Sequence, residues 1–251
     1  MVQYLLKVYT KTENSQVLII PRDDKVVFSG ITTNWFDFEL LRKEGNFVGK
    51  SKGRHITWFI KSQIKADDAP WVLRHYYRGG MISKITTDKF IYTGLENTRG
   101  FREVNLLLEM LEMNLPVPKP IGARINRKGI FYTADLLMEK IEAKDLVAKM
   151  SSSELSNTQW NGVGKVIADF HKAGIYHADL NAHNVMIDDM NKVYLIDFDR
   201  CEKRTVDTSW RCKNLERLKR SLLKEKGLIE NFKFENENWL EFMKGYRSVI
   251  E

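Results

Sequence analysis

Residues 176–200 read YHADLNAHNVMIDDMNKVYLIDFDR and combine histidine, aspartate and asparagine side chains in a stretch otherwise typical of loop and strand. Asp179 is followed five residues later by Asn184, and Asp197 ends an apolar run. A metal cage, a hydrolase and a kinase could each use these residue types. The elements around them must therefore decide which chemistry applies.

The residue types allow two kinds of metal site. His177, Asp179 and His183 could bind Zn²⁺ or Fe²⁺, because imidazole and carboxylate suit these ions. The remaining histidines of the chain supply no second cluster, which argues against such a site. Asp179, Asn184 and Asp197 instead offer hard oxygen ligands and one potential base, a set that suits Mg²⁺.

A predicted hairpin brings these oxygens together. VMID at 185–188 and VYLIDFD at 193–199 are short apolar strands, and residues 189–191 form the turn between them. Pairing of the two strands would place the loop that ends at Asn184 close to Asp197. Phosphoryl transfer requires this arrangement: a carboxylate for the proton of the acceptor, and two oxygen ligands for the metal on the phosphates.

The first 140 residues favour strands around one helix. Short strands rich in aromatic and β-branched residues are expected between 46 and 75, with the glycines of GKSKG in the turn between the first two. Apolar residues near helical spacing predict a helix over 98–113, and residues 121–141 predict a hairpin that turns at 126–129. The helical apolar residues are Phe101, Val104, Leu108 and Leu111. Residues 1–45 give no clear assignment.

The second half of the chain favours helices. Residues 156–175 carry a helical apolar face that ends near Gly174, a good C-terminal residue for a helix, and two further helices are expected at 208–228 and 237–249. The face consists of Trp160, Val163, Ile167 and Phe170. Segregation of strands and helices predicts an α+β fold.

Composition and charge bound the class of protein. With 251 residues the chain can form one large domain or two small lobes. It contains no apolar run long enough to span a bilayer, and the first residues do not predict a signal peptide. Its two cysteines fit a reducing compartment. The net charge is +7, and residues 200–226 hold ten Lys or Arg against four acids, which indicates an anionic partner or a solvated helix face.

The residues around Asp179 resemble the catalytic loop of protein-kinase-like enzymes. HADLNAHN at 177–184 is similar to H-x-D-x-x-x-x-N, and IDFD at 196–199 lies where that fold has its metal-binding Asp-Phe-Gly. The resemblance implies a two-lobed fold with a strand-rich N-lobe and a mainly helical C-lobe. It also implies ATP and Mg²⁺, with Asp179 as the catalytic residue and Asn184 and Asp197 as metal ligands.

The same resemblance assigns residues to the nucleotide. Arg74 stands where the family has a lysine, Glu103 is expected to pair with it, and Glu96 is the less favoured partner. Glu139 and Ile141 fall at the hinge, where backbone groups meet the adenine. The glycine turn over the phosphates corresponds to Gly49, Lys50, Ser51, Lys52 and Gly53. The implied domains are an N-lobe at 1–137 with an N-terminal extension at about 1–45, a hinge at 138–142 and a C-lobe at 143–251.

A closer resemblance runs from about residue 48 to 204. LRHYYRGG (73–80), LENTRGFREVNLL (95–107), LPVPKPIGARI (115–125) and HADLNAHNVMID (177–188) are similar to the bacterial Kdo kinases of the lipopolysaccharide kinase family. This resemblance implies transfer of the ATP γ-phosphate to the 4-hydroxyl of a 3-deoxy-D-manno-octulosonic acid (Kdo) residue on a lipid A precursor. It also implies a peripheral position at the cytoplasmic face of the bacterial inner membrane.

Departures from the protein-kinase pattern favour a small-molecule or glycolipid acceptor. Ala178 replaces the arginine that reads a phosphorylated activation loop, Asp199 replaces a glycine, and Asn181 replaces the lysine that assists the transferred phosphate. Another cation must therefore serve that phosphate. Arg78, just after the third strand, could face the acceptor or γ-phosphate, or cap a loop.

Three alternatives stay open at this point. A kinase of another core sugar such as heptose, or of another small molecule, would have the same catalytic residues. A pseudokinase that binds anionic lipid would use the basic segment alone, in which Trp210, Leu215, Leu218, Leu222 and Leu223 could contact a membrane or pack the core. A nucleic-acid partner is not expected, because no stacking-aromatic motif accompanies the charge. No obligate protein partner is evident.

Overall fold

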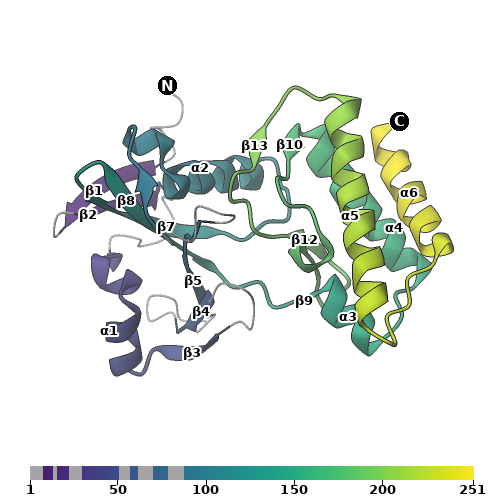
Figure 1. Ribbon diagram of the computed structural model, residues 1–251, viewed down its shortest axis with the longest axis horizontal. Helices are drawn as coiled ribbons and strands as arrows, with labels where there is room; N and C mark the ends of the chain where they lie inside the picture. The colour runs from purple at the N-terminus through teal and green to yellow at the C-terminus, as the bar shows by residue number, and fades with distance from the viewer. Residues whose placement is uncertain (1–7, 14–15, 23–29, 51–56, 62–69, 79–87) are drawn as a thin grey trace. The chain divides into compact units, whose positions relative to one another are not determined.

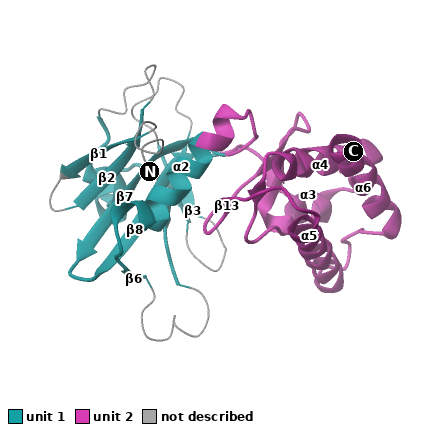
Figure 2. Ribbon diagram, turned by 90° about the horizontal axis from the view of Figure 1, so that it is seen from above, with its two compact units in different colours: residues 1–108, 118–140 teal, residues 109–117, 141–251 magenta. Residues whose placement is uncertain are grey.

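The computed structural model describes residues 8–13, 16–22, 30–50, 57–61, 70–78 and 88–251. Its fold is α+β, with an antiparallel sheet and a separate group of helices, as the sequence predicts (Figure 1). Contacts divide the chain into two compact units (Figure 2). The first contains Met1–Leu108 and Pro118–Lys140, and the second contains Glu109–Val117 and Ile141–Glu251.

The first unit is built on one antiparallel sheet, in which the described strands follow the order β1-β2-β7-β8-β5-β4-β3 and β6 pairs with β8. The strand bounds are β1 Val8–Glu13, β2 Gln16–Pro21, β3 Phe47–Lys50, β4 Thr57–Ile60, β5 Trp71–His75, β6 Phe90–Ile91, β7 Pro120–Lys128 and β8 Phe131–Glu139. The helical segments are η3 Thr33–Phe36, α1 Phe38–Lys43, η5 Leu95–Asn97 and α2 Arg99–Glu112.

Both faces of this sheet are covered by apolar packing. One face holds a buried cluster that α1 and η3 complete with Leu41 and Phe36. On the other face α2 begins directly against β7: a Cβ built on Gly100 would lie 3.0 Å from the Cβ of Ala123. The β7–β8 ladder continues to the pair Lys128–Phe131, so the chain turns at residues 129–130 and not at 126–129.

Two details of the first unit differ from the sequence predictions. The fully buried residues in the later part of α2 are Leu107 and Met110, whereas the predicted Leu108 and Leu111 are only partly buried. Residues 1–45, which gave no assignment, contain β1 and β2, and β2 pairs with β7. β1 and β2 therefore extend the sheet beyond β7, and β1 forms one edge of the described strands.

The second unit is mainly helical, with α3 Leu146–Ser152, α4 Asn157–Lys172, η6 Ala182–Asn184, α5 Thr208–Leu228 and α6 Asn236–Ile250. Its short strands are β9 Lys144–Asp145, β10 Ile175–Tyr176, β11 Val185–Ile187, β12 Val193–Leu195 and β13 Glu202–Lys203. The predicted bounds of α5 are confirmed, and its Trp210, Leu215, Leu218 and Leu222 are buried, whereas Leu223 is exposed. None of the described helices is both long and apolar enough to cross a bilayer.

Helices α4 and α6 approach so closely that glycine is required at their contact. A Cβ on Gly164 would lie 2.0 Å from the carbonyl oxygen of Phe242, and one on Gly245 would lie 2.0 Å from that of Asn161. The apolar residues of α4 that the sequence predicts to face the core are all buried. Because both collisions are with backbone atoms, a rotamer change cannot relieve them.

We predict that Gly164→Ala destabilises the protein strongly, by about 2 kcal/mol or more, because one of the helices must move away and lose packing. Gly162→Ala is the matched control two residues earlier in α4, since nothing lies within 4 Å of the place that its added methyl group would take. That control should be neutral or gain up to about 1 kcal/mol from helix propensity. Denaturant unfolding of the two variants measures this, and equal stabilities would contradict the packing argument.

His171 makes the stability of this unit depend on pH. Its Nδ1 lies 2.8 Å from the Tyr246 hydroxyl, and burial lowers the pKa of His171 to about 4. A histidine in the unfolded chain has a pKa near 6.5, so on acidification His171 binds a proton in the unfolded chain but not in the folded one. Stability from this group is therefore complete above about pH 6.5 and is lost as the pH falls towards about 4.

We predict that His171 alone costs about 2 kcal/mol of unfolding free energy between about pH 7 and about pH 5. His171→Gln should reduce the pH dependence by this amount while retaining a polar group beside Tyr246. Denaturant unfolding at the two pH values measures the difference. An unchanged slope in the variant would exclude His171 as its source.

Candidate active site

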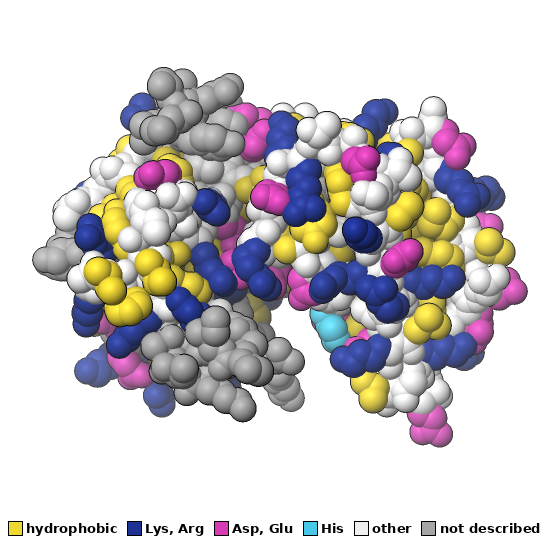
Figure 3. All heavy atoms as spheres, turned by 45° about the horizontal axis from the view of Figure 1, so that its top comes forward, with side chains coloured by type: hydrophobic (Ala, Val, Ile, Leu, Met, Phe, Trp, Pro, Cys, Tyr) yellow, Lys and Arg dark blue, Asp and Glu magenta, His cyan; other side chains and the backbone are white. Residues whose placement is uncertain are grey.

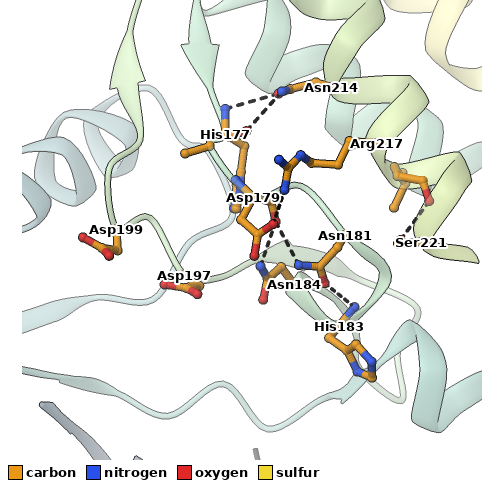
Figure 4. A network of polar contacts seen from close by, with 12 residues as sticks. His177, Asp179, Asn181, His183, Asn184, Asp197, Asp199, Asn214, Arg217 and Ser221 are labelled. Atoms are coloured by element: carbon orange, nitrogen blue, oxygen red, sulfur yellow. Dashed lines mark hydrogen bonds and ion pairs between the residues drawn. The ribbon is translucent and has the colours of Figure 1, made fainter. Parts of the chain in front are cut away.

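A short hairpin fixes the end of the predicted catalytic loop next to Asp197. β11 pairs antiparallel with β12, with Val185 opposite Leu195. Beyond this pair, the N–H of Ile196 donates to the carbonyl oxygen of Asn184 at 3.1 Å. This hydrogen bond holds the backbone before Asp197 next to Asn184. Figure 4 shows Asn184 and Asp197 beside the loop that carries Asp179.

The backbone at Asp197 adopts an uncommon conformation. Its φ is +64°, in the left-handed region that non-glycine residues rarely occupy. The next residue, Phe198, is fully buried, and its ring stacks on Phe170 with centroids 6.0 Å apart. Anchoring of Phe198 holds the strained turn in place, and such strain is typical of functional sites.

His177 joins the loop to the end of β12. The side chain is 2% exposed, its Nε2 lies 3.0 Å from the carbonyl oxygen of Ile196, and its Nδ1 lies 3.2 Å from the N–H of Asp179. Because a carbonyl only accepts, Nε2 carries the proton and Nδ1 is the acceptor. Burial lowers the pKa of His177, which keeps this neutral form at neutral pH. His177 therefore supports the loop through both ring nitrogens.

Two asparagine side chains fold the loop around Asp179. The amide nitrogens of Asn181 and Asn184 donate to the carbonyl oxygen of Asp179 at 3.0 and 2.9 Å. The side-chain oxygen of Asn181 also accepts from the N–H of His183 at the start of η6. With its main chain held, Asp179 presents its carboxylate, which is 48% exposed, to solvent.

The loop offers no histidine-based metal cluster. His183 is exposed and lies 3.6 Å from the carboxylates of Asp145 and Glu225. Across the described part of the chain, no three or more His, Cys, Asp or Glu side chains are grouped so that they could hold an ion. Asn184 and Asp197 form a smaller set of amide and carboxylate oxygens, the donor chemistry that Mg²⁺ prefers.

Helix α5 supplies functional contacts that the sequence reasoning missed. Asn214 accepts from the N–H of His177 at 3.2 Å and donates to its carbonyl oxygen at 3.1 Å, and the hydroxyl of Ser221 accepts from the N–H of Ala182 at 2.9 Å. Between them, Arg217 forms an ion pair with the carboxylate of Asp179 (Figure 4). The i, i+3, i+7 spacing of these three polar residues could have indicated a shared face.

In the first unit, Arg74 and Glu103 form an ion pair with 2.5 Å between Nη2 and Oε2. The Tyr76 hydroxyl donates to the same carboxylate at 2.7 Å, and Glu103 is only 3% exposed. Glu96 instead lies beside Gly94. The contact expected between β5 and α2 is therefore formed by Glu103.

Other residues assigned to the nucleotide are placed as follows. Gly49 and Lys50 are the last two residues of β3 and pair with Phe59 and Trp58. The expectation that they belong to a turn is therefore wrong. Ser51, Lys52 and Gly53 lie outside the described residues.

Glu139 ends β8, and its N–H donates to the carbonyl oxygen of Lys119 at 2.9 Å. The carbonyl oxygen of Ile141 accepts from Ala143 at 3.0 Å. Arg78 donates from Nε to the carbonyl oxygen of Lys89 at 2.5 Å, which is the loop contact that was one of its two expected roles.

Comparison with known proteins assigns the sequence to a family. The sequence profile of the lipopolysaccharide kinase (Kdo/WaaP) family matches residues 39–246. The chain belongs to this family. The matched region contains both Arg74 and Glu103 of the first unit and the whole of the loop that α5 holds.

Relatives that carry the name of a Kdo kinase agree with this assignment. The chain is 39% identical over 233 residues to the 3-deoxy-D-manno-octulosonic acid kinase of Actinobacillus succinogenes, covering 91% of this chain and 93% of that protein. It is 42% identical over 220 residues to the enzyme of the same name from Mannheimia succiniciproducens, covering 86% and 90%. The corresponding protein of Vibrio cholerae is 40% identical over 205 residues, covering 76% and 85%.

We predict that Asn214→Ala loosens the loop, because the N–H and carbonyl of buried His177 both lose their partner. A buried polar group left without a partner costs about 1–3 kcal/mol, so the loss of both partners should lower the unfolding free energy by about 2 kcal/mol or more. Hydrogen exchange at the His177 amide should accelerate. Lys213→Ala, at an exposed position beside Asn214, should change neither quantity, and equal exchange in both variants would contradict the assignment.

Proposed function

We propose that this protein is an ATP-dependent kinase that phosphorylates the 4-hydroxyl of a Kdo residue on a lipid A precursor. The carrying observation is the loop of Asp179, Asn184 and Asp197, held by His177 and α5, in a member of the lipopolysaccharide kinase family. The names of the relatives support Kdo as the acceptor sugar. The reaction belongs to lipopolysaccharide core biosynthesis.

In this proposal Asp179 is the catalytic residue. Its exposed carboxylate binds the acceptor hydroxyl and receives or orients its proton, while its main chain is fixed by Asn181, Asn184 and His177. Phosphoryl transfer requires positioning and charge stabilisation more than covalent participation of the protein. A rigid loop with one exposed carboxylate meets that requirement.

Asn184 and Asp197 are the proposed Mg²⁺ ligands. Asn184 directly precedes β11, Asp197 follows β12, and both offer oxygen donors, so the residues present fit a hard divalent cation. When bound, Mg²⁺ neutralises negative charge on the phosphates of ATP. The chain contributes the fixed separation of the two segments through the Ile196–Asn184 hydrogen bond.

Arg74 is the proposed contact to the nucleotide phosphates, held in place by Glu103. Residues 49–53 and the backbone of Glu139 and Ile141 complete the proposed nucleotide site. We also propose that the two compact units are the N-lobe and C-lobe of a protein-kinase-like fold, joined near residues 138–142. The division between Lys140 and Ile141 supports this boundary.

The proposed acceptor lies at a membrane, so we propose a peripheral position on the cytoplasmic face of the inner membrane. α5 carries exposed basic side chains, among them Lys213 and Lys224, that could meet anionic headgroups. Figure 3 shows Lys and Arg side chains over this face of the second unit, with acidic side chains among them. The net charge of +7 also favours binding of the protein to an anionic membrane surface.

We predict that the purified protein with Mg·ATP transfers phosphate to a Kdo–lipid A precursor, and that Asp179→Ala lowers kcat by about 10²–10⁴-fold. ATP binding should be largely unchanged, because Asp179 is proposed to bind the acceptor. The measurements are product analysis that locates the phosphate, steady-state kinetics, and nucleotide titration.

Asp189→Ala is the control, since this aspartate is fully exposed in the hairpin turn ten residues along the chain. It should retain wild-type turnover. Wild-type turnover by Asp179→Ala would refute its catalytic role. Phosphorylation of a heptose-bearing acceptor, with none on Kdo, would refute the proposed substrate.

A further inference from the structure

The described catalytic loop contains no cation of its own for the transferring phosphate. Residues 177–184 read HADLNAHN, without lysine or arginine. Asn181 cannot substitute for a cation, because it is uncharged and its amide already bonds Asp179 and His183. During transfer, a phosphoryl group carries negative charge on its equatorial oxygens. A nearby Asp179 carboxylate without a counter-charge would repel it.

Arg217 brings a guanidinium to this point from a distant part of the chain. It lies on α5, 38 residues after Asp179, and forms an ion pair with the Asp179 carboxylate. Among the described residues the structure gives the guanidinium no other hydrogen-bond acceptor. Because an arginine has five N–H donors, one bond to Asp179 leaves others for a ligand.

The Arg217–Asp179 pair is not what holds the loop. Each side chain is 48% exposed, and an ion pair in such surroundings adds about 0–1 kcal/mol to stability. The loop is held by Asn214 and Ser221, which bond its backbone one turn before and one turn after Arg217. These contacts fix the helix against the loop and thereby place Arg217 at Asp179 (Figure 4).

We propose that Arg217 is the catalytic cation that binds the γ-phosphoryl group during its transfer. The inference rests on the proposed kinase function and names a further residue of that site. Any acceptor hydroxyl bonded to Asp179 lies beside the guanidinium of Arg217, and so does the phosphorus that this hydroxyl attacks. Arg217 therefore supplies the positive charge for which Asn181 is no substitute.

The charge balance of the step agrees with this role. The acceptor oxygen forms a bond to phosphorus, the bond from phosphorus to the bridging oxygen of ADP breaks, and the hydroxyl proton moves to Asp179. Protonation removes the negative charge that Arg217 balances before the reaction. The guanidinium is then balanced by the transferred phosphate, so its interaction strengthens as transfer proceeds, and such an interaction accelerates the reaction.

We predict that Arg217→Gln lowers kcat by about 10²–10³-fold, with the KM values for Mg·ATP and acceptor changed by less than about threefold. Arg217→Lys should recover part of kcat because the charge is kept and the planar fork is lost. Added guanidinium should partly rescue Arg217→Ala. Arg247→Gln, the same change at an exposed position on α6, is the control and should behave as wild type.

Binding provides a readout that does not depend on turnover. With acceptor present, Arg217→Gln should bind Mg·ADP as wild type does but bind Mg·ADP with fluoroaluminate, a mimic of the transferring phosphoryl group, at least about tenfold more weakly. Wild-type kcat in Arg217→Gln, or a raised acceptor KM with kcat unchanged, would overturn the proposal. Absence of phosphate transfer by the wild-type protein would instead refute the proposed kinase function. Thermal unfolding of each variant separates loss of fold from loss of catalysis.

Discussion

The geometry of the site depends on a buried, neutral imidazole. His177 uses both ring nitrogens, one to bond Ile196 next to Asp197 and the other to bond the N–H of Asp179. Only the form protonated on Nε2 makes both bonds, and burial, which lowers the pKa of His177, preserves it. The His177 side chain, together with the Ile196–Asn184 backbone hydrogen bond, thus sets the position of the loop against the end of β12.

Helix α5 completes the site because its apolar residues attach the helix to the second unit while its polar residues contact the catalytic loop. Leu218 and Leu222 are fully buried and hold the helix to the second unit. Asn214, Arg217 and Ser221 contact the loop at its start, at Asp179 and at η6. Since apolar burial fixes the helix, its polar face can approach the loop without depending on exposed ion pairs for stability.

Much of the second unit could be predicted from the sequence because its signals are local. The apolar period of α4, the glycine that ends it and the strands around 185–199 are consequences of neighbouring residues. The same is true of Asp179, Asn184 and Asp197, whose spacing is set by one loop and one hairpin. Their catalytic and metal-binding roles stay predictions.

The features that sequence reasoning missed depend on contacts between distant segments. Pairing of β2 with β7 joins residues about a hundred positions apart, and no local pattern in 16–21 specifies that partner. Arg217 counted only as part of a basic segment, because its neighbour Asp179 lies 38 residues away. In α2 the period was correct, but the buried stripe runs through Leu107 and Met110, since the sheet on which the helix packs selects one of two adjacent apolar rows.

Arginine at position 74 changes the shape of the donor group more than the charge balance around it. Arg74 of β5 and Tyr76, the residue directly after β5, are two positions apart and reach the same buried carboxylate of Glu103. A buried carboxylate needs both a counter-charge and hydrogen bonds, and these two residues provide them. A guanidinium can donate to Glu103 with one side of its fork and to a phosphate with the other, whereas a lysine would present one compact ammonium to both. The Arg74–Glu103 pair thus retains the charge pairing expected of a kinase, and the proposed contact of Arg74 to phosphate would be directional.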